Sequence, residues 1–123
     1  MKSDDNFFSF EKMEVWKLSQ ELVVDVYKLV KKFPAYETYG LSNQLRRAIV
    51  SVPSNIAEGN GRTSANEKVR FIEIAYSSLL ESYNQLAIAE DLKYVTEMEL
   101  ASVKNKFFLI AKMLAGLRAK FKK

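Results

Sequence analysis

The side chains of this sequence that could do chemistry are its arginines and lysines. Arg46 and Arg47 are adjacent, and a guanidinium group matches the oxygens of a phosphate with two parallel hydrogen bonds. On a helix the two side chains diverge by about 100°, so only one of them needs to point between helices. The pair therefore predicts a phosphate contact, and an ion pair between helices or between subunits is the alternative.

A second basic group lies near the end of the chain. From residue 93 to residue 123 there are eight bases against two acids, a net charge of +6, whereas residues 66–92 carry five acids against two bases, a net charge of −3. Lys104, Lys112 and Lys120 recur every eight residues, so they turn slowly around one side of a helix and could follow a phosphate backbone. Charge matching between copies and a solubilising C-terminus are the alternatives. The predicted nucleic-acid-binding residues are Arg46, Arg47, Arg62, Lys104, Lys112, Arg118 and Lys120.

Composition disfavours most catalytic chemistry. The chain has no histidine and no cysteine, so it lacks the commonest general base, the thiolate nucleophile and the usual zinc ligands. Its acids are scattered singly, which disfavours a metal-assisted nuclease. We expect no catalytic residue, no metal and no cofactor.

Apolar residues recur at alternating intervals of three and four along four segments, which is typical of helices that pack together. The segments are about 12–32, 40–59, 65–92 and 97–121, after an N-terminal arm at 1–10. Short connections favour antiparallel neighbours. The sequence therefore predicts an all-α fold, a single-domain antiparallel up-down-up-down four-helix bundle over residues 1–123.

Local signals support these boundaries. Ser64 with Glu67, and Thr96 with Glu99, have the spacing of a capping box at a helix start. Pro53 interrupts the second segment, where an interior proline costs about 3 kcal/mol. We expect the helix to continue through Pro53 because packing recovers this cost.

The third segment predicts a subunit interface. Its face opposite the apolar stripe holds small and neutral polar groups where a solvated face would carry more charge. Glu58 lies at the end of the second helix, where the helix dipole disfavours a carboxylate, so we expect a cation nearby, with Arg62 as the local candidate. A bland solvated face and a packing salt bridge are the alternatives. The predicted interface residues are Glu58, Ser78, Glu81, Ser82 and Gln85.

Four aromatic residues are further candidates for stacking on bases: Trp16, Tyr27, Tyr36 and Tyr39. Core or interface packing is the favoured interpretation for them. No apolar run approaches the roughly 20 residues needed to span a membrane. The first ten residues, MKSDDNFFSF, include two aspartates and do not resemble an export signal. We therefore expect a cytoplasmic protein without a membrane partner.

One long motif also carries a family resemblance. The run GLSNQLRRAIVSVPSNIAEGNGR at 40–62 is preceded by FPAYETY and followed by a helix that contains SSLLES. Residues from about 10 to 121 resemble the 23S rRNA intervening-sequence proteins of bacteria, which are four-helix bundles. The resemblance implies a homopentamer, with nucleic-acid binding as in some members. The accessory variability protein of diversity-generating retroelements belongs to the same fold family, so a reverse transcriptase partner is implied by analogy only.

Together these observations favour a non-enzymatic homo-oligomeric scaffold that binds RNA or DNA through basic surfaces with low sequence specificity. The alternative is a purely structural oligomer, or an adaptor for a protein partner, without nucleic-acid binding.

Overall fold

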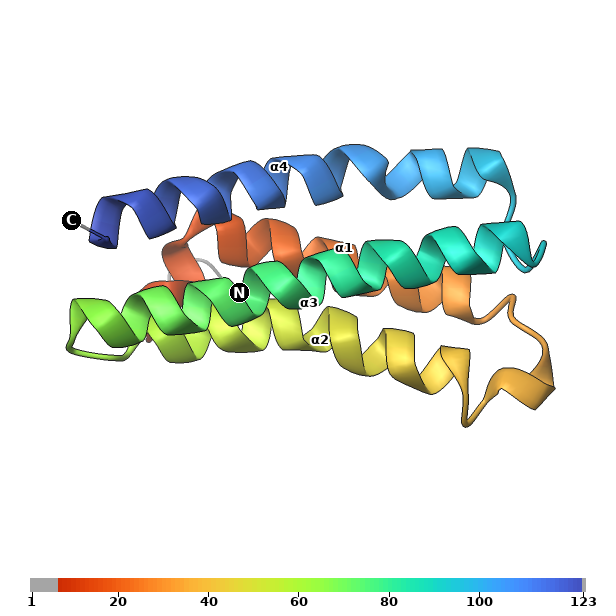
Figure 1. The fold of residues 1–123 in the computed structure, drawn as a ribbon, viewed down its shortest axis with the longest axis horizontal. Coiled ribbons are helices and arrows are strands. Elements are labelled where there is room, and N and C mark those ends of the chain that lie inside the picture. The colour runs from red at the N-terminus through yellow and green to blue at the C-terminus, as the bar shows by residue number, and fades with distance from the viewer. Residues whose placement is uncertain (1–6, 123) are drawn as a thin grey trace.

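Four helices form the molecule in the computed structural model, which describes residues 7–122 (Figure 1). They are α1 (Glu14–Val30), α2 (Leu41–Asn60), α3 (Ala65–Asp91) and α4 (Glu97–Phe121). Short 3-10 helices precede α1 (Ser9–Lys12) and α2 (Ala35–Glu37). Residues 1–6 of the predicted arm and the basic residue Lys123 lie outside the described residues. The predicted four-helix bundle is confirmed, with boundaries that differ by one or two residues.

Consecutive helices run in opposite directions, and each packs on two others (Figure 1). The α1 helix contacts α2 and α4, while α3 contacts the same two helices from the other side. Within residues 7–122, α1 does not contact α3 and α2 does not contact α4. The α2 and α4 helices therefore lie diagonally across the bundle.

The apolar stripes predicted from the sequence meet inside the bundle. Each helix contributes fully buried side chains to a single core, which include Leu22, Leu45, Leu79, Leu86, Ile110 and Leu114. Pro53 is buried within α2, and the helix continues through it to Asn60, as expected. Burying this proline and its apolar neighbours offsets the lost backbone hydrogen bond.

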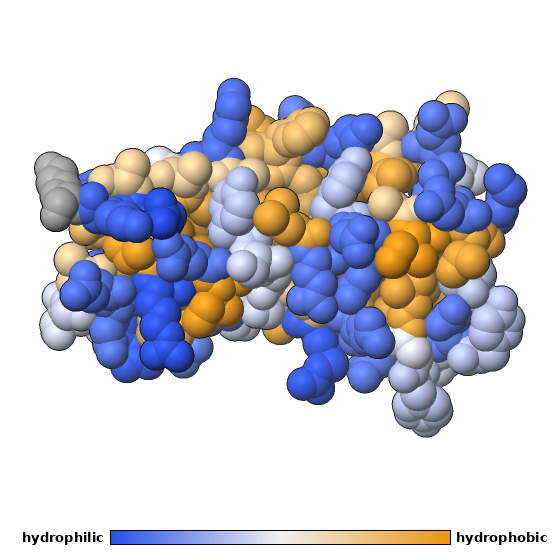
Figure 2. Space-filling view, viewed as in Figure 1, coloured by the Kyte–Doolittle hydropathy of each residue, from blue (hydrophilic) through white to orange (hydrophobic). Residues whose placement is uncertain are grey.

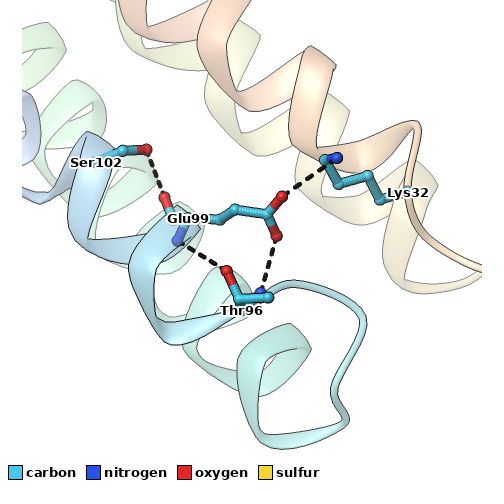
Figure 3. A network of polar contacts seen from close by, with 4 residues as sticks. All are labelled: Lys32, Thr96, Glu99 and Ser102. Atoms are coloured by element: carbon cyan, nitrogen blue, oxygen red, sulfur yellow. Dashed lines mark hydrogen bonds and ion pairs between the residues drawn. The ribbon is translucent and has the colours of Figure 1, made fainter.

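The two predicted capping boxes differ. Thr96 forms the complete box: its hydroxyl accepts from the Glu99 amide at 3.0 Å, and the Glu99 carboxylate accepts from the Thr96 amide at 2.9 Å (Figure 3). Ser64 accepts from the Glu67 amide at 3.1 Å, but the Glu67 carboxylate lies 3.8 Å from Arg62. Glu67 therefore forms an ion pair in place of the second half of its box.

Three of the polar residues of α3 that the sequence assigned to a subunit interface lie inside the chain, which corrects the outward orientation expected for them. Ser78, Ser82 and Gln85 are buried against α2, and Ser82 has no exposed surface. The Ser78 and Ser51 hydroxyl oxygens are 2.8 Å apart, and the Gln85 amide nitrogen lies 3.4 Å from the side-chain oxygen of Gln44. Small side chains are present here because α2 and α3 of one chain pack closely. An interface role for the exposed Glu58 and Glu81 stays a prediction.

The partner expected for Glu58 is also wrong. Arg62 pairs with Glu67 and places its guanidinium 4.7 Å from the centre of the Phe71 ring. Glu58 forms no ion pair within residues 7–122. The Arg62 guanidinium thus lies beside Glu67 and Phe71 in the first turns of α3.

Candidate nucleic-acid interface

Ion pairs divide the bases of α4 into two groups. Lys106 lies 2.6 Å from Asp25 and 3.5 Å from Glu21 on α1, and the hydrogen bond with Asp25 raises the pKa of the Lys106 ammonium group. Arg118 lies 2.6 Å from Glu73 on α3. These two bases form ion pairs that link α4 to α1 and to α3. Arg118, which the sequence assigned to nucleic acid, is therefore engaged with a carboxylate in the isolated chain.

The other bases of α4 face solvent. Lys104, Lys112 and Lys120 are exposed and form no ion pair within residues 7–122. No acidic residue follows Glu99 in the sequence. Since unpaired charges of one sign attract an anionic polymer and release its counterions, this helix is the strongest candidate surface for nucleic acid.

The predicted arginine pair lies on α2, at a separate surface hollow of about 390 Å³. Arg46 is half-buried and Arg47 is exposed, and neither forms an ion pair within residues 7–122. Tyr27 of α1 and Ser51 of α2 also line the hollow. The arrangement offers two guanidinium groups to a phosphate. Because α2 is diagonal to α4, the structure does not bring these arginines together with the lysines of α4 within one chain.

A third basic region lies where α2 ends and α3 begins. Lys68 donates to the backbone oxygen of Asn60 at 3.0 Å, and its ammonium lies 5.6 Å from the centre of the Phe121 ring. The ammonium of Lys120 lies at the same distance from that ring. Lys68 and Lys120 lie at a cavity of about 240 Å³ that Phe121 also lines. The predicted residues Arg118 and Lys120 thus lie at the C-terminal end of α4, next to α3. They are separate from Lys104 and Lys112, which lie nearer the middle of α4.

One residue that sequence reasoning missed is Phe108. Phe107 belongs to the apolar stripe and is only 4% exposed, whereas Phe108 points about 100° away and is 63% exposed. Phe108 lines a groove of about 480 Å³ between α3 and α4, together with Tyr76, Asn105 and Lys112. In Figure 2, hydrophobic side chains reach the surface between polar ones on the side of the molecule that shows α3 and α4. The available signal was the second of two adjacent phenylalanines, which a single apolar stripe cannot bury.

The four aromatic candidates named from the sequence differ in burial and in the residues that they contact. Trp16 is half-buried and packs edge-on against Phe10, with ring centres 5.2 Å apart. Tyr36 and Tyr39 are exposed, and the Tyr36 hydroxyl lies 3.2 Å from that of Tyr94. Tyr27 lines the arginine hollow of α2. None of the four lies at the exposed lysines of α4.

Two kinds of feature are absent from the part of the chain that the structure describes. Among residues 7–122, no three acidic side chains gather in a way that could hold a metal ion. Over the same range, no helix has both the length and the apolar character required to cross a membrane.

Comparison with known proteins identifies the family. Residues 11–116 match the family model described as 23S rRNA-intervening sequence protein. A crystal structure of a protein of unknown function from the S23 ribosomal protein family of Bacteroides thetaiotaomicron has the same fold, with a TM-score of 0.74 and 23% identity. The alignment covers 85% of this chain and 97% of that one. No protein with a curated description matches the sequence. Because the family model covers most of the chain, this protein belongs to the 23S rRNA-intervening sequence protein family.

Proposed function

We propose that this protein is a non-enzymatic, homopentameric scaffold of the cytoplasm that binds RNA or DNA through its basic surfaces with low sequence specificity. The observation that carries the proposal is the set of exposed lysines on α4, which have no carboxylate partner within residues 7–122. Lysines of this kind contact phosphates without reading bases, so affinity without strong sequence preference is expected.

Oligomer formation supports binding because it multiplies the basic surfaces. One chain presents its α2 arginines and its α4 lysines on diagonal helices, so a short nucleic acid cannot contact both groups on the same face. Several copies in one assembly would place α2 of one chain and α4 of another along one path. The number five is the one that the family resemblance implies.

The proposal is tested by fluorescence anisotropy with labelled RNA and labelled duplex DNA at about 50 and 200 mM salt. We expect binding of both at low salt and a steep loss of affinity at high salt, because counterions released on binding must be taken up again. Replacing Lys104 and Lys112 with Gln should lower the salt dependence by about 0.7–0.9 per lysine in log–log slope. Lys17→Gln is the matched control, since Lys17 pairs with Glu14 on α1.

Absence of binding at low salt would contradict the proposal. In that case sedimentation across a salt series would test the purely structural oligomer, which loosens as salt screens contacts between charged subunits.

A further inference from the structure

Phe108 lies midway between two lysines on the surface of α4. Lys104, Phe108 and Lys112 are spaced by four residues, so they lie along one slowly turning line on the helix. With a rise of about 1.5 Å per residue, the lysines are about 12 Å apart along the axis and the ring is about 6 Å from each. Both lysines are exposed, so an aromatic face is flanked on each side by a free positive charge.

The fold of the isolated chain does not require this ring. Phe107 supplies the aromatic contact of the core and packs edge-on against Tyr83, with ring centres 5.2 Å apart. Phe108 remains 63% exposed, which leaves a large apolar surface in water. An exposed aromatic side chain with no packing role is a candidate for contact with a ligand.

The groove beside the ring has room for a planar group. Its lining residues from α4 include Ala111 and Ala115, whose small side chains leave the space open, and Tyr76 of α3 closes the other side. Asn105 lines the same groove and carries an amide that can donate to and accept from the edge of a base. Among the described residues 7–122, no acidic side chain lines the groove and Lys112 is its only charged lining residue.

We propose that the groove between α3 and α4 binds a single-stranded segment of RNA or DNA, with a base stacked on Phe108 and the flanking phosphates held by Lys104 and Lys112. This inference rests on the proposed function and assigns it to one surface. The alternation of positive charge and aromatic ring matches the alternation of phosphate and base in a single strand. A duplex keeps its bases stacked on one another, so it can use the lysines but not the ring.

The test compares one labelled single-stranded RNA with the duplex of the same sequence. Phe108→Ala should weaken binding of the single strand by about 5- to 150-fold, since stacking on one aromatic residue contributes about 1–3 kcal/mol. It should leave the duplex affinity and the salt dependence unchanged. Phe108→Trp should keep or strengthen single-strand binding. Lys104→Gln and Lys112→Gln should each weaken binding of both the single strand and the duplex. Met98→Ala, at an exposed position in the first turn of α4 that does not line the groove, is the control for a lost apolar side chain.

The outcomes separate this inference from the function on which it rests. If the unaltered protein binds neither ligand at low salt, the proposed function itself fails. If it binds both and Phe108→Ala changes neither affinity, the function stands and the groove assignment is wrong. If light scattering shows that Phe108→Ala changes the mass of the assembly, Phe108 is a contact between subunits and the assignment is overturned.

Discussion

At the scale of single residues, Gly59 lets α2 and α3 approach each other closely because it has no side chain. A Cβ atom added at Gly59 would lie 2.7 Å from the Cβ of Phe71, at the crossing of α2 and α3. Phe71 cannot move its Cβ without moving the backbone of α3, so the two helices have to separate. Gly61, which follows the last residue of α2, caps the helix, and its amide donates to the oxygen of Glu58 at 3.1 Å.

We expect Gly59→Ala to destabilise the fold by about 1–3 kcal/mol, because overpacking forces the backbone to shift. Gly116→Ala is the matched control: Gly116 lies within α4 with nothing within 4 Å of an added Cβ. That substitution should stabilise the protein by about 0.5–1 kcal/mol through helix propensity. Urea denaturation measures both changes, and a stabilising Gly59→Ala would mean that α2 and α3 are farther apart than described.

At the scale of the elements, α3 ends in a motif that usually contains glycine. The amide of Tyr94 donates to the oxygen of Ala89 at 2.8 Å and the amide of Lys93 donates to that of Glu90 at 3.0 Å, as in a Schellman motif. Lys93 holds the left-handed position with φ of 69°. This conformation costs a residue with a Cβ about 1–2 kcal/mol.

Replacing Lys93 with Gly should therefore raise the free energy of unfolding by about 0.5–1 kcal/mol, after allowance for the greater chain entropy of glycine when unfolded. Lys93→Ala removes the same charge and keeps the Cβ, so it should give no such gain. Thermal or urea unfolding of Lys93→Gly and Lys93→Ala measures the difference in stability between the two variants. Equal stabilities for the two variants would show that the left-handed backbone is not the source of the cost.

At the scale of the whole molecule, two carboxylates connect the loops at one end of the bundle. Glu37 accepts from the Leu41 amide at 2.9 Å and from the Tyr94 hydroxyl at 2.8 Å. Glu99 accepts from the Thr96 amide and lies 3.2 Å from Lys32 of the first connection (Figure 3). In each case the backbone hydrogen bond is the main reason that the pKa of the carboxyl is lowered from 4.5.

The sign of the pH dependence follows from these shifts. A carboxyl with a lower pKa in the folded state binds fewer protons there, so its stabilisation is present above about pH 4.5 and is lost as the pH falls through the folded value. We expect Glu37→Gln and Glu99→Gln to be less stable than the unaltered protein at neutral pH, and to differ from it progressively less in acid as the pH falls through the folded pKa. Urea midpoints at neutral pH and in acid measure the effect, and a difference that does not shrink in acid would contradict it.

The arrangement of charge is also a property of the whole molecule. The α1–α4 pairing neutralises Lys106 with Asp25, and the α3–α4 pairing neutralises Arg118 with Glu73. Lys104 and Lys112 are exposed on α4 and have no ion-pair partner among residues 7–122. Ion pairs thus neutralise the bases of α4 that face α1 and α3, and the bases on the solvent-facing side of α4 keep their positive charge. This selection by the bundle is what makes the outer face of α4 the candidate surface.

The sequence by itself determined the number of helices, most of their core positions and the complete cap at Thr96. These features depend on short-range periodicity and on side chains that contact their own helix, so the spacing of residues is sufficient to predict them. The continuation of α2 through Pro53 could also be anticipated, because the apolar stripe persists on both sides of the proline.

Only the tertiary structure decided which surface groups are free. Spacing along a helix does not reveal which neighbour a face contacts, so the serines of α3 suggested a subunit contact although they pack against α2 of the same chain. For the same reason Arg118 could not be distinguished from Lys112 until Glu73 was placed beside it. Phe108 emerged as a candidate in the same way, because burial of Phe107 in the core leaves the adjacent ring facing solvent on a helix of about 3.6 residues per turn.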